Sequence, residues 1–121
     1  MQILNLDHVA LLVKNIAASC KFYEDVLTLK SIPRPAFDFP GAWFQIGATQ
    51  QLHLIGRQEA QEFVPLRSNH FAMQVASIKE AEQHLLAKNA TFTGPKTRPD
   101  GAWQIFIQDP DGHYVELTEI V

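Results

Sequence analysis

The sequence predicts an α+β fold built from two tandem βαβββ modules that form one cupped mixed sheet in a single domain. The main observation is a repeat, because the stretch that begins Asp7-His8 recurs as Asn69-His70, 62 residues later in a chain of 121. Each copy is an apolar, strand-like run that ends at a helix-start residue. Each half alone would leave one apolar sheet face uncovered, and pairing the halves buries both faces.

In the first half, residues 3–13 alternate as a strand, with His8 on one face and Val9, Leu11 and Val13 on the face expected to meet a helix. Asn15 is a good N-cap for a helix of about three turns. Three strands should follow, interrupted by a proline-containing loop at 34–40; they span residues 29–32, 41–46 and 50–55.

The second half repeats this order. Ser77 and Glu80 form a capping box for a helix that should end near Asn89, and its apolar stripe comprises Ile78, Ala81, Leu85 and Leu86. Strands are expected at residues 90–95, 101–107 and 113–120, with a turn at 109–112. The modules therefore occupy about residues 1–57 and 69–121, joined by a linker at about 58–68.

Composition narrows the class of protein. Hydrophobic residues make up 46% and charged residues 19%, which is typical of a globular domain. The net charge of −3 and the scattered Lys and Arg residues argue against nucleic-acid binding. No apolar run is long enough to span a membrane, and the single cysteine, Cys20, fits a reducing compartment. We therefore expect a cytoplasmic protein with neither a nucleic-acid nor a membrane partner.

Four polar residues occupy two equivalent positions in the repeat. His8 matches His70 on the first strands, and His53 matches Glu116 on the last strands. If first and last strands are neighbours in each half, these side chains converge, and three imidazoles with one carboxylate suit one divalent ion such as Zn, Ni, Fe, Mn or Co. A single histidine on a strand is more often an ordinary polar residue, but the repeat favours ligands. A buried Glu116 also needs a pair or a cation.

Aromatic and basic residues suggest a substrate pocket. The motif Gly-Ala-Trp occurs twice, ending at Trp43 and at Trp103, and Phe37 and Phe39 lie in the proline-containing loop. These side chains can line a pocket, form a dimer contact or fill the core. Phe63 in the linker is a further candidate lid residue. One or two of the loop arginines could hold an anionic group, with Arg34 ranked above Arg57, Arg67 and Arg98.

The repeat resembles the vicinal oxygen chelate superfamily of glyoxalases, bleomycin resistance proteins and extradiol dioxygenases. The resemblance is carried by the doubled unit, by His8 and His70, by the turn Asp109-Pro110-Asp111-Gly112 and by the closing Tyr114-Val115-Glu116-Leu117. It implies that His8, His53, His70 and Glu116 are the metal positions. Glyoxalase I would have a glutamate at position 53, so only Glu116 remains here to move a proton.

The function that this resemblance implies is a metal-dependent, glyoxalase-like lyase or isomerase. Its small substrate would chelate the ion through adjacent oxygens, and a developing enediolate or similar oxyanion would be stabilised, with Glu116 as the catalytic residue. Arg34, Phe37, Phe39, Trp43 and Trp103 would contact the substrate. The alternatives are a thiol transferase, a dioxygenase, or a metal-free small-molecule binding protein of the drug-resistance type. Members commonly share sites across two chains, so a homodimer is expected.

Overall fold

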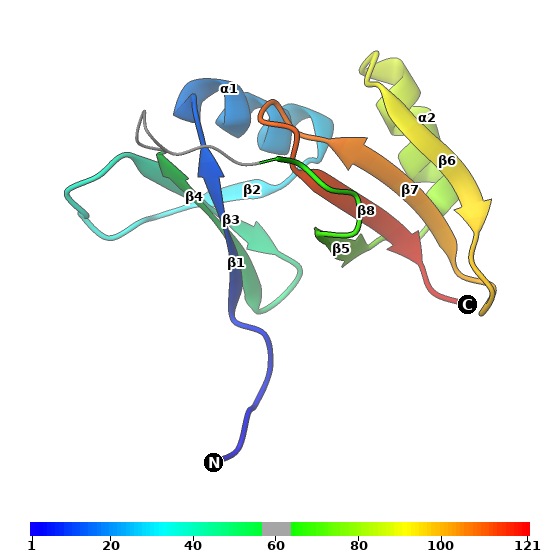
Figure 1. The fold of residues 1–121 in the computed structure, drawn as a ribbon, viewed down its shortest axis with the longest axis horizontal. Helices are drawn as coiled ribbons and strands as arrows, with labels where there is room; N and C mark the ends of the chain where they lie inside the picture. The colour runs from blue at the N-terminus through cyan, green and yellow to red at the C-terminus, as the bar shows by residue number, and fades with distance from the viewer. Residues whose placement is uncertain (57–63) are drawn as a thin grey trace. The chain divides into compact units, whose positions relative to one another are not determined.

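The computed structural model describes residues 1–56 and 64–121, which fall into two compact units, Met1–Glu62 and Phe63–Val121 (Figure 1). Each unit is one βαβββ module, so the predicted tandem fold is confirmed. Unit 1 contains β1 (His8–Val13), α1 (Ile16–Lys21), the π-helical η1 (Phe22–Val26), β2 (Lys30–Ile32), β3 (Gly41–Ile46) and β4 (Gln50–Gly56). Unit 2 contains β5 (His70–Gln74), α2 (Ile78–Ala87), β6 (Phe92–Thr97), β7 (Trp103–Gln108) and β8 (Tyr114–Glu119). Residues 57–63, which include part of the predicted linker, lie outside the described residues.

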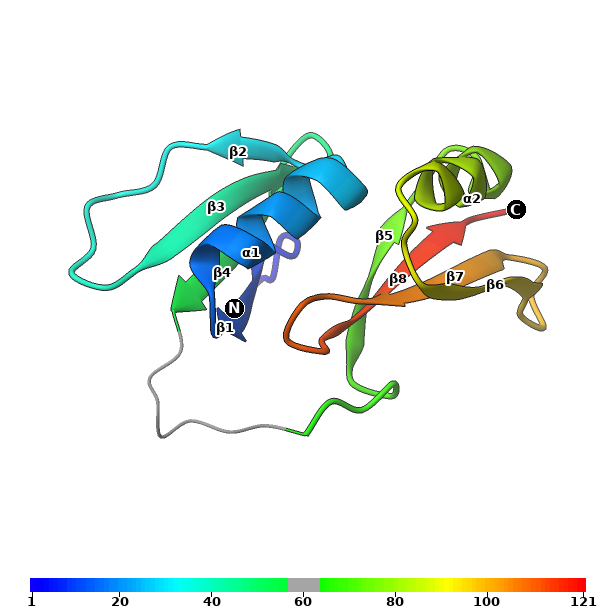
Figure 2. The same cartoon turned by 90° about the horizontal axis from the view of Figure 1, so that it is seen from above.

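Both sheets have the same topology, with strand orders β1-β4-β3-β2 and β5-β8-β7-β6. The first and last strands of each unit are therefore parallel neighbours, which is the condition under which the predicted ligands approach one another in pairs. The registers agree as well, because Ala10 pairs with His53 and Ala72 pairs with Glu116. Parallel pairing at this register brings the side chain at position 8 beside that at 53, and the side chain at 70 beside that at 116. In both units the helix lies along one face of its sheet (Figure 2).

The first strand is shorter than predicted. It begins at His8 rather than at residue 3, because its partner β4 begins at Gln50 and the first residue of β4 to pair with β1 is Gln51. The Gln51 N–H donates to the Asp7 carbonyl at 3.1 Å, and the preceding residues have no strand beside them. Ile3 and Leu4 are accordingly exposed, at 77% and 84%.

The predicted helix-facing side of the first strand forms the core of unit 1. Val13 is fully buried, as are Leu52 and Leu54 on β4 and Phe44 on β3. Tyr23 of η1 is also fully buried, and its ring lies 6.3 Å from the Phe44 ring. Burying each such side chain stabilises the fold by about 1.5–3 kcal/mol. The opposite face of this sheet, which carries His53, is left free of the helix.

The second helix begins as predicted but differs in its apolar stripe. The Ser77 hydroxyl accepts a hydrogen bond from the Glu80 N–H at 3.1 Å, and the Glu119 carboxylate accepts one from the Ile78 N–H at 2.9 Å. Leu85 is 1% exposed, whereas Leu86 is 59% exposed, so the prediction that Leu86 faces the sheet is wrong. Adjacent helix positions are about 100° apart, and the side chain after Leu85 turns toward solvent. No helix among the described residues is long and apolar enough to cross a bilayer.

The N-cap of α1 should make a measurable contribution to stability. The Asn15 side chain accepts a hydrogen bond from the Ala18 N–H at 3.0 Å. We expect Asn15→Ala to reduce the free energy of unfolding by about 1 kcal/mol, because a helix-terminal N–H loses its partner. Urea unfolding followed by circular dichroism measures this, with the exposed Asn5→Ala as the matched control. An equal effect of both substitutions would contradict the prediction.

Candidate functional site

His70 and Glu116 form a close pair on the open face of the sheet in unit 2. The Nε2 atom of His70 lies 3.2 Å from Oε1 of Glu116. The other ring nitrogen, Nδ1, lies 2.7 Å from the carbonyl oxygen of Arg67, and it must be protonated because a carbonyl can only accept. The backbone carbonyl therefore fixes both the orientation of the ring and the position of its proton.

Glu116 is buried, at 3% exposed, and its carboxylate is only partly satisfied. Gln104 donates from Nε2 to Oε1 at 3.2 Å. The Oε2 atom has no hydrogen-bond partner among the described residues, although the Arg98 guanidinium lies 3.9 Å away. A buried carboxylate oxygen without a hydrogen bond is costly, so a cation bound directly to it would stabilise the folded protein.

The geometry of this pair suits two ligands of one divalent ion. With the ring proton on Nδ1, a neutral His70 directs the Nε2 lone pair at a carboxylate oxygen. Two acceptors at this distance require a positive charge between them, either a proton or a metal ion. Ligand bonds of about 2.0–2.2 Å in tetrahedral geometry place neighbouring donor atoms roughly 3.3–3.5 Å apart, close to the observed separation.

The histidines of unit 1 are also neighbours, but they are stacked. The rings of His8 and His53 have centroids 4.0 Å apart and planes at 18°, and His53 also stacks on Trp43 at 3.9 Å and 3°. Imidazole lone pairs lie in the ring plane, so those of parallel rings run side by side and do not converge on one point. One ring would have to turn before both could bind a single ion. This pair is therefore less well arranged for a metal than His70 and Glu116.

The stack also affects the protonation of His53. Burial, the nearby His8 and the Arg34 charge lower the pKa of His53, while the Asp7 carboxylate acts in the opposite direction. The Nε2–H of His53 donates to the Gln51 side-chain oxygen at 2.8 Å, and His8 contacts the Asp7 carboxylate through Nδ1, also at 2.8 Å. A lowered pKa keeps the imidazole of His53 neutral, which is the form that binds metal ions.

Four of the predicted substrate residues lie together in unit 1. The Arg34 guanidinium lies 4.9 Å and 4.8 Å from the rings of Phe37 and Phe39, and it donates to the Phe39 carbonyl at 2.9 Å. Phe37 also lies 6.2 Å from Trp43, which joins this loop to the His53 stack. Arg34 therefore stabilises its own loop, and its guanidinium makes cation–π contacts with two aromatic rings.

Trp103 is placed differently from Trp43. Trp43 pairs with His53, but the residue that pairs with Glu116 is Phe106, and Trp103 pairs with Glu119. The Gly-Ala-Trp motif recurs after 60 residues, whereas His53 and Glu116 are 63 apart. A difference of three residues, an odd number, moves a strand side chain to the opposite face. Trp103 thus lies on the α2 side of the sheet, away from Glu116.

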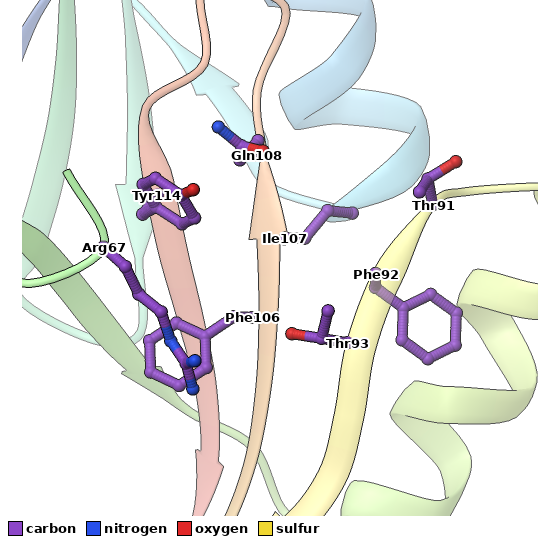
Figure 3. Close-up of a pocket in the computed structure, with 8 residues that line it drawn as sticks. All are labelled: Arg67, Thr91, Phe92, Thr93, Phe106, Ile107, Gln108 and Tyr114. Atoms are coloured by element: carbon purple, nitrogen blue, oxygen red, sulfur yellow. The ribbon is translucent and has the colours of Figure 1, made fainter. Parts of the chain in front are cut away.

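The structure adds residues that were not singled out from the sequence. Gln104 binds Glu116, and Phe106 packs edge-on against His70 with ring centroids 5.2 Å apart. The sequence contains a signal for Phe106, because this residue follows Trp43 by 63 residues, the same offset that separates His53 from Glu116. Arg67 lies over Phe106 at the edge of a cavity of about 340 Å³ (Figure 3). The candidates Arg57 and Phe63 lie outside the described residues.

Neither unit, in its described residues, gathers three or more His, Cys, Asp or Glu side chains into a group suited to a metal ion. The predicted ligands are found instead as two pairs, one in each unit. The pair of unit 2 fits half of a metal site on its own geometry.

A repeated βαβββ unit that presents such pairs on its open faces defines a glyoxalase-type protein. Residues 5–117 match the family model of the Glyoxalase/Bleomycin resistance protein/Dioxygenase superfamily, and the chain belongs to this family. It is 27% identical to Glyoxylase I 4 of Arabidopsis thaliana over 97% of this chain and 71% of that protein.

Solved structures agree with this assignment. A glyoxalase family protein from Bacillus anthracis is 26% identical, with a TM-score of 0.87 over 100% of this chain and 98% of that chain. The lactoylglutathione lyase from Agrobacterium tumefaciens is 22% identical, with a TM-score of 0.76 over 95% and 92%, a likeness that extends to the fold alone.

The His53 pKa provides a test of the stack. In metal-free protein we expect His8→Ala to raise the pKa of His53, because the substitution removes both a covering ring and a nearby positive charge. For wild type the lowered pKa means that His53 stabilises the fold above the ordinary histidine pKa, and this contribution is lost as the pH falls through the lowered value. NMR titration of the imidazole protons measures the shift. Lys30→Gln is the control, and an unchanged His53 titration in His8→Ala would refute the stacked arrangement.

Proposed function

We propose that this protein is a divalent-metal-dependent, glyoxalase-like lyase or isomerase whose small substrate chelates the ion through adjacent oxygens. The observation that supports it most directly is the His70–Glu116 pair, with facing acceptor atoms at 3.2 Å and a buried Oε2 that accepts no hydrogen bond from the described residues. The relationship to Glyoxylase I 4 of Arabidopsis thaliana supports the same class of reaction.

In this proposal His8, His53, His70 and Glu116 hold the ion. The bound ion supplies a Lewis acid for the oxyanion that develops on the substrate. Glu116 accepts the substrate proton and returns it to the neighbouring carbon. Gln104 keeps the carboxylate oriented. The Arg67 carbonyl keeps the proton of His70 on Nδ1, which leaves Nε2 free to bind.

The donor set differs from one with two carboxylates. Three neutral imidazoles and one carboxylate leave a single positive charge on a divalent centre, which favours an anionic ligand or transition state. The four ligands can come from one chain or from two chains of the proposed homodimer. Sedimentation at micromolar concentration distinguishes these arrangements, because a monomer with a full complement of metal excludes a shared site.

A second function is favoured by one observation, the stacked rings of unit 1. Parallel rings at 3.9 Å and 4.0 Å form an aromatic surface that Phe37 extends. Such a surface suits a binding protein that holds a flat ligand without a metal ion. Metal content separates the two functions, because a binding protein of this type needs no ion.

The first test of the proposed function is metal affinity. We expect untagged wild-type protein to bind one Ni²⁺ or Zn²⁺ per site, and His70→Ala to weaken that binding by at least about tenfold, because one of four ligands is lost. Isothermal titration calorimetry measures the affinity. His84→Ala on α2 is the matched control. Equal affinities of wild type and His70→Ala would exclude this site.

The second test is turnover. Metal-loaded protein should convert hemithioacetals of 2-oxoaldehydes to thioesters, followed by absorbance. Glu116→Gln should lower kcat by roughly 10²–10⁴-fold, because the base is lost while the shape is kept. Glu80→Gln, at an exposed position on α2, should retain wild-type activity. A fully active Glu116→Gln variant would show that another group moves the proton.

A further inference from the structure

Part of the lining of the cavity of about 340 Å³ in unit 2 lies on the same sheet face as the proposed ligands, whereas Phe92 and Ile107 line it from the other face. Tyr114 pairs with His70, Gln108 pairs with Tyr114, and Thr93 pairs with Phe106. Directly paired residues point to the same face, so these cavity side chains share the face of His70. A volume of this size is at the lower end of the range for small-molecule sites.

Arg67 provides the charge in this cavity. Its guanidinium carbon lies 4.3 Å from the centroid of the Phe106 ring, and that ring lies 5.2 Å from the His70 ring. The ring of Phe106 thus lies between the guanidinium of Arg67 and the imidazole of His70, the proposed metal ligand. Figure 3 shows Arg67 lying across Phe106, with the Thr93 hydroxyl turned toward them.

The charge of Arg67 is not used elsewhere in the part of the chain that the structure describes. No carboxylate of residues 1–56 or 64–121 forms a salt bridge with it, whereas Arg98 binds Asp100 at 2.7 Å. Arg34 donates to its own loop. A guanidinium stacked on an aromatic ring keeps its N–H groups in a plane from which they can bind a carboxylate through two bonds.

We propose that Arg67 binds an anionic group of the substrate, so that the enzyme selects small carboxylates whose chelating oxygens lie near His70 and whose carboxylate reaches the cavity. The position of the chelating oxygens rests on the proposed function. The position of the substrate carboxylate rests only on the cavity and Arg67. The apolar part of the substrate packs on Phe106, and Thr93 and Tyr114 supply hydroxyl groups to the carboxylate.

The test uses metal-free protein and two probes of the same shape, benzoate and benzamide. We expect benzoate to bind with a Kd about fivefold lower than that of benzamide, which is the order of difference between charge-assisted and neutral hydrogen bonds at a partly exposed site. Amide shifts of Thr93, Gln108 and Tyr114 in ¹⁵N NMR titrations give both the Kd and the location. Arg67→Gln should abolish the preference, and Arg67→Lys should retain part of it.

The variants are chosen so that the ligand geometry is preserved. His70 is held by the backbone carbonyl of Arg67, which remains in both substitutions. Lys88→Gln removes one positive charge at an exposed position and should leave the preference unchanged. The inference is overturned if Arg67→Gln keeps the preference for benzoate, or if neither probe shifts the cavity amides. Because no metal is present, these results are independent of the metal titration that tests the proposed function.

Discussion

The site depends on the parallel pairing of the first and last strands within each unit. This pairing joins segments that are far apart in sequence, and its register sets residue 70 beside residue 116 and residue 8 beside residue 53. A shift of one residue would turn one member of each pair into the apolar core beneath the helix. The core therefore enforces the site, because Leu52, Leu54, Val115 and Leu117 are buried only in the observed register.

The two units use one backbone plan for different local chemistry. In unit 2 a histidine and a carboxylate face each other, so the pair is attractive to a cation and costly without one. In unit 1 two imidazoles and an indole form a stack of nearly parallel rings. The difference follows from two equivalent positions. The last strand carries Glu116 in unit 2 and His53 in unit 1, and the residue paired with it is Phe106 in unit 2 and Trp43 in unit 1.

Most of the fold could be predicted from the repeat, since alternation, caps and turn residues are local signals. Asn15, Ser77 and the turn at residues 109–112 are examples whose function depends on a few neighbouring residues. The start of β1 could not be predicted, because it depends on where β4 begins. The different placement of Trp43 and Trp103 could not be predicted either, because the motif Gly-Ala-Trp does not specify the strand register. The His70–Glu116 proximity followed from the repeat, but the stacking in unit 1 depends on ring orientation, which sequence does not encode locally.

The main chain and the side chain of Arg67 have different roles. The main chain of residue 67 orients the histidine, and the side chain faces the cavity. Any amino acid that preserves the local backbone would supply the same carbonyl, so the side chain at this position is free to vary without loss of the histidine's orientation. A scaffold with this property can change the compounds it accepts by one substitution while its reactive centre stays intact. If Arg67 binds the substrate as proposed, position 67 is the place at which a substitution would redirect this protein toward neutral or cationic compounds.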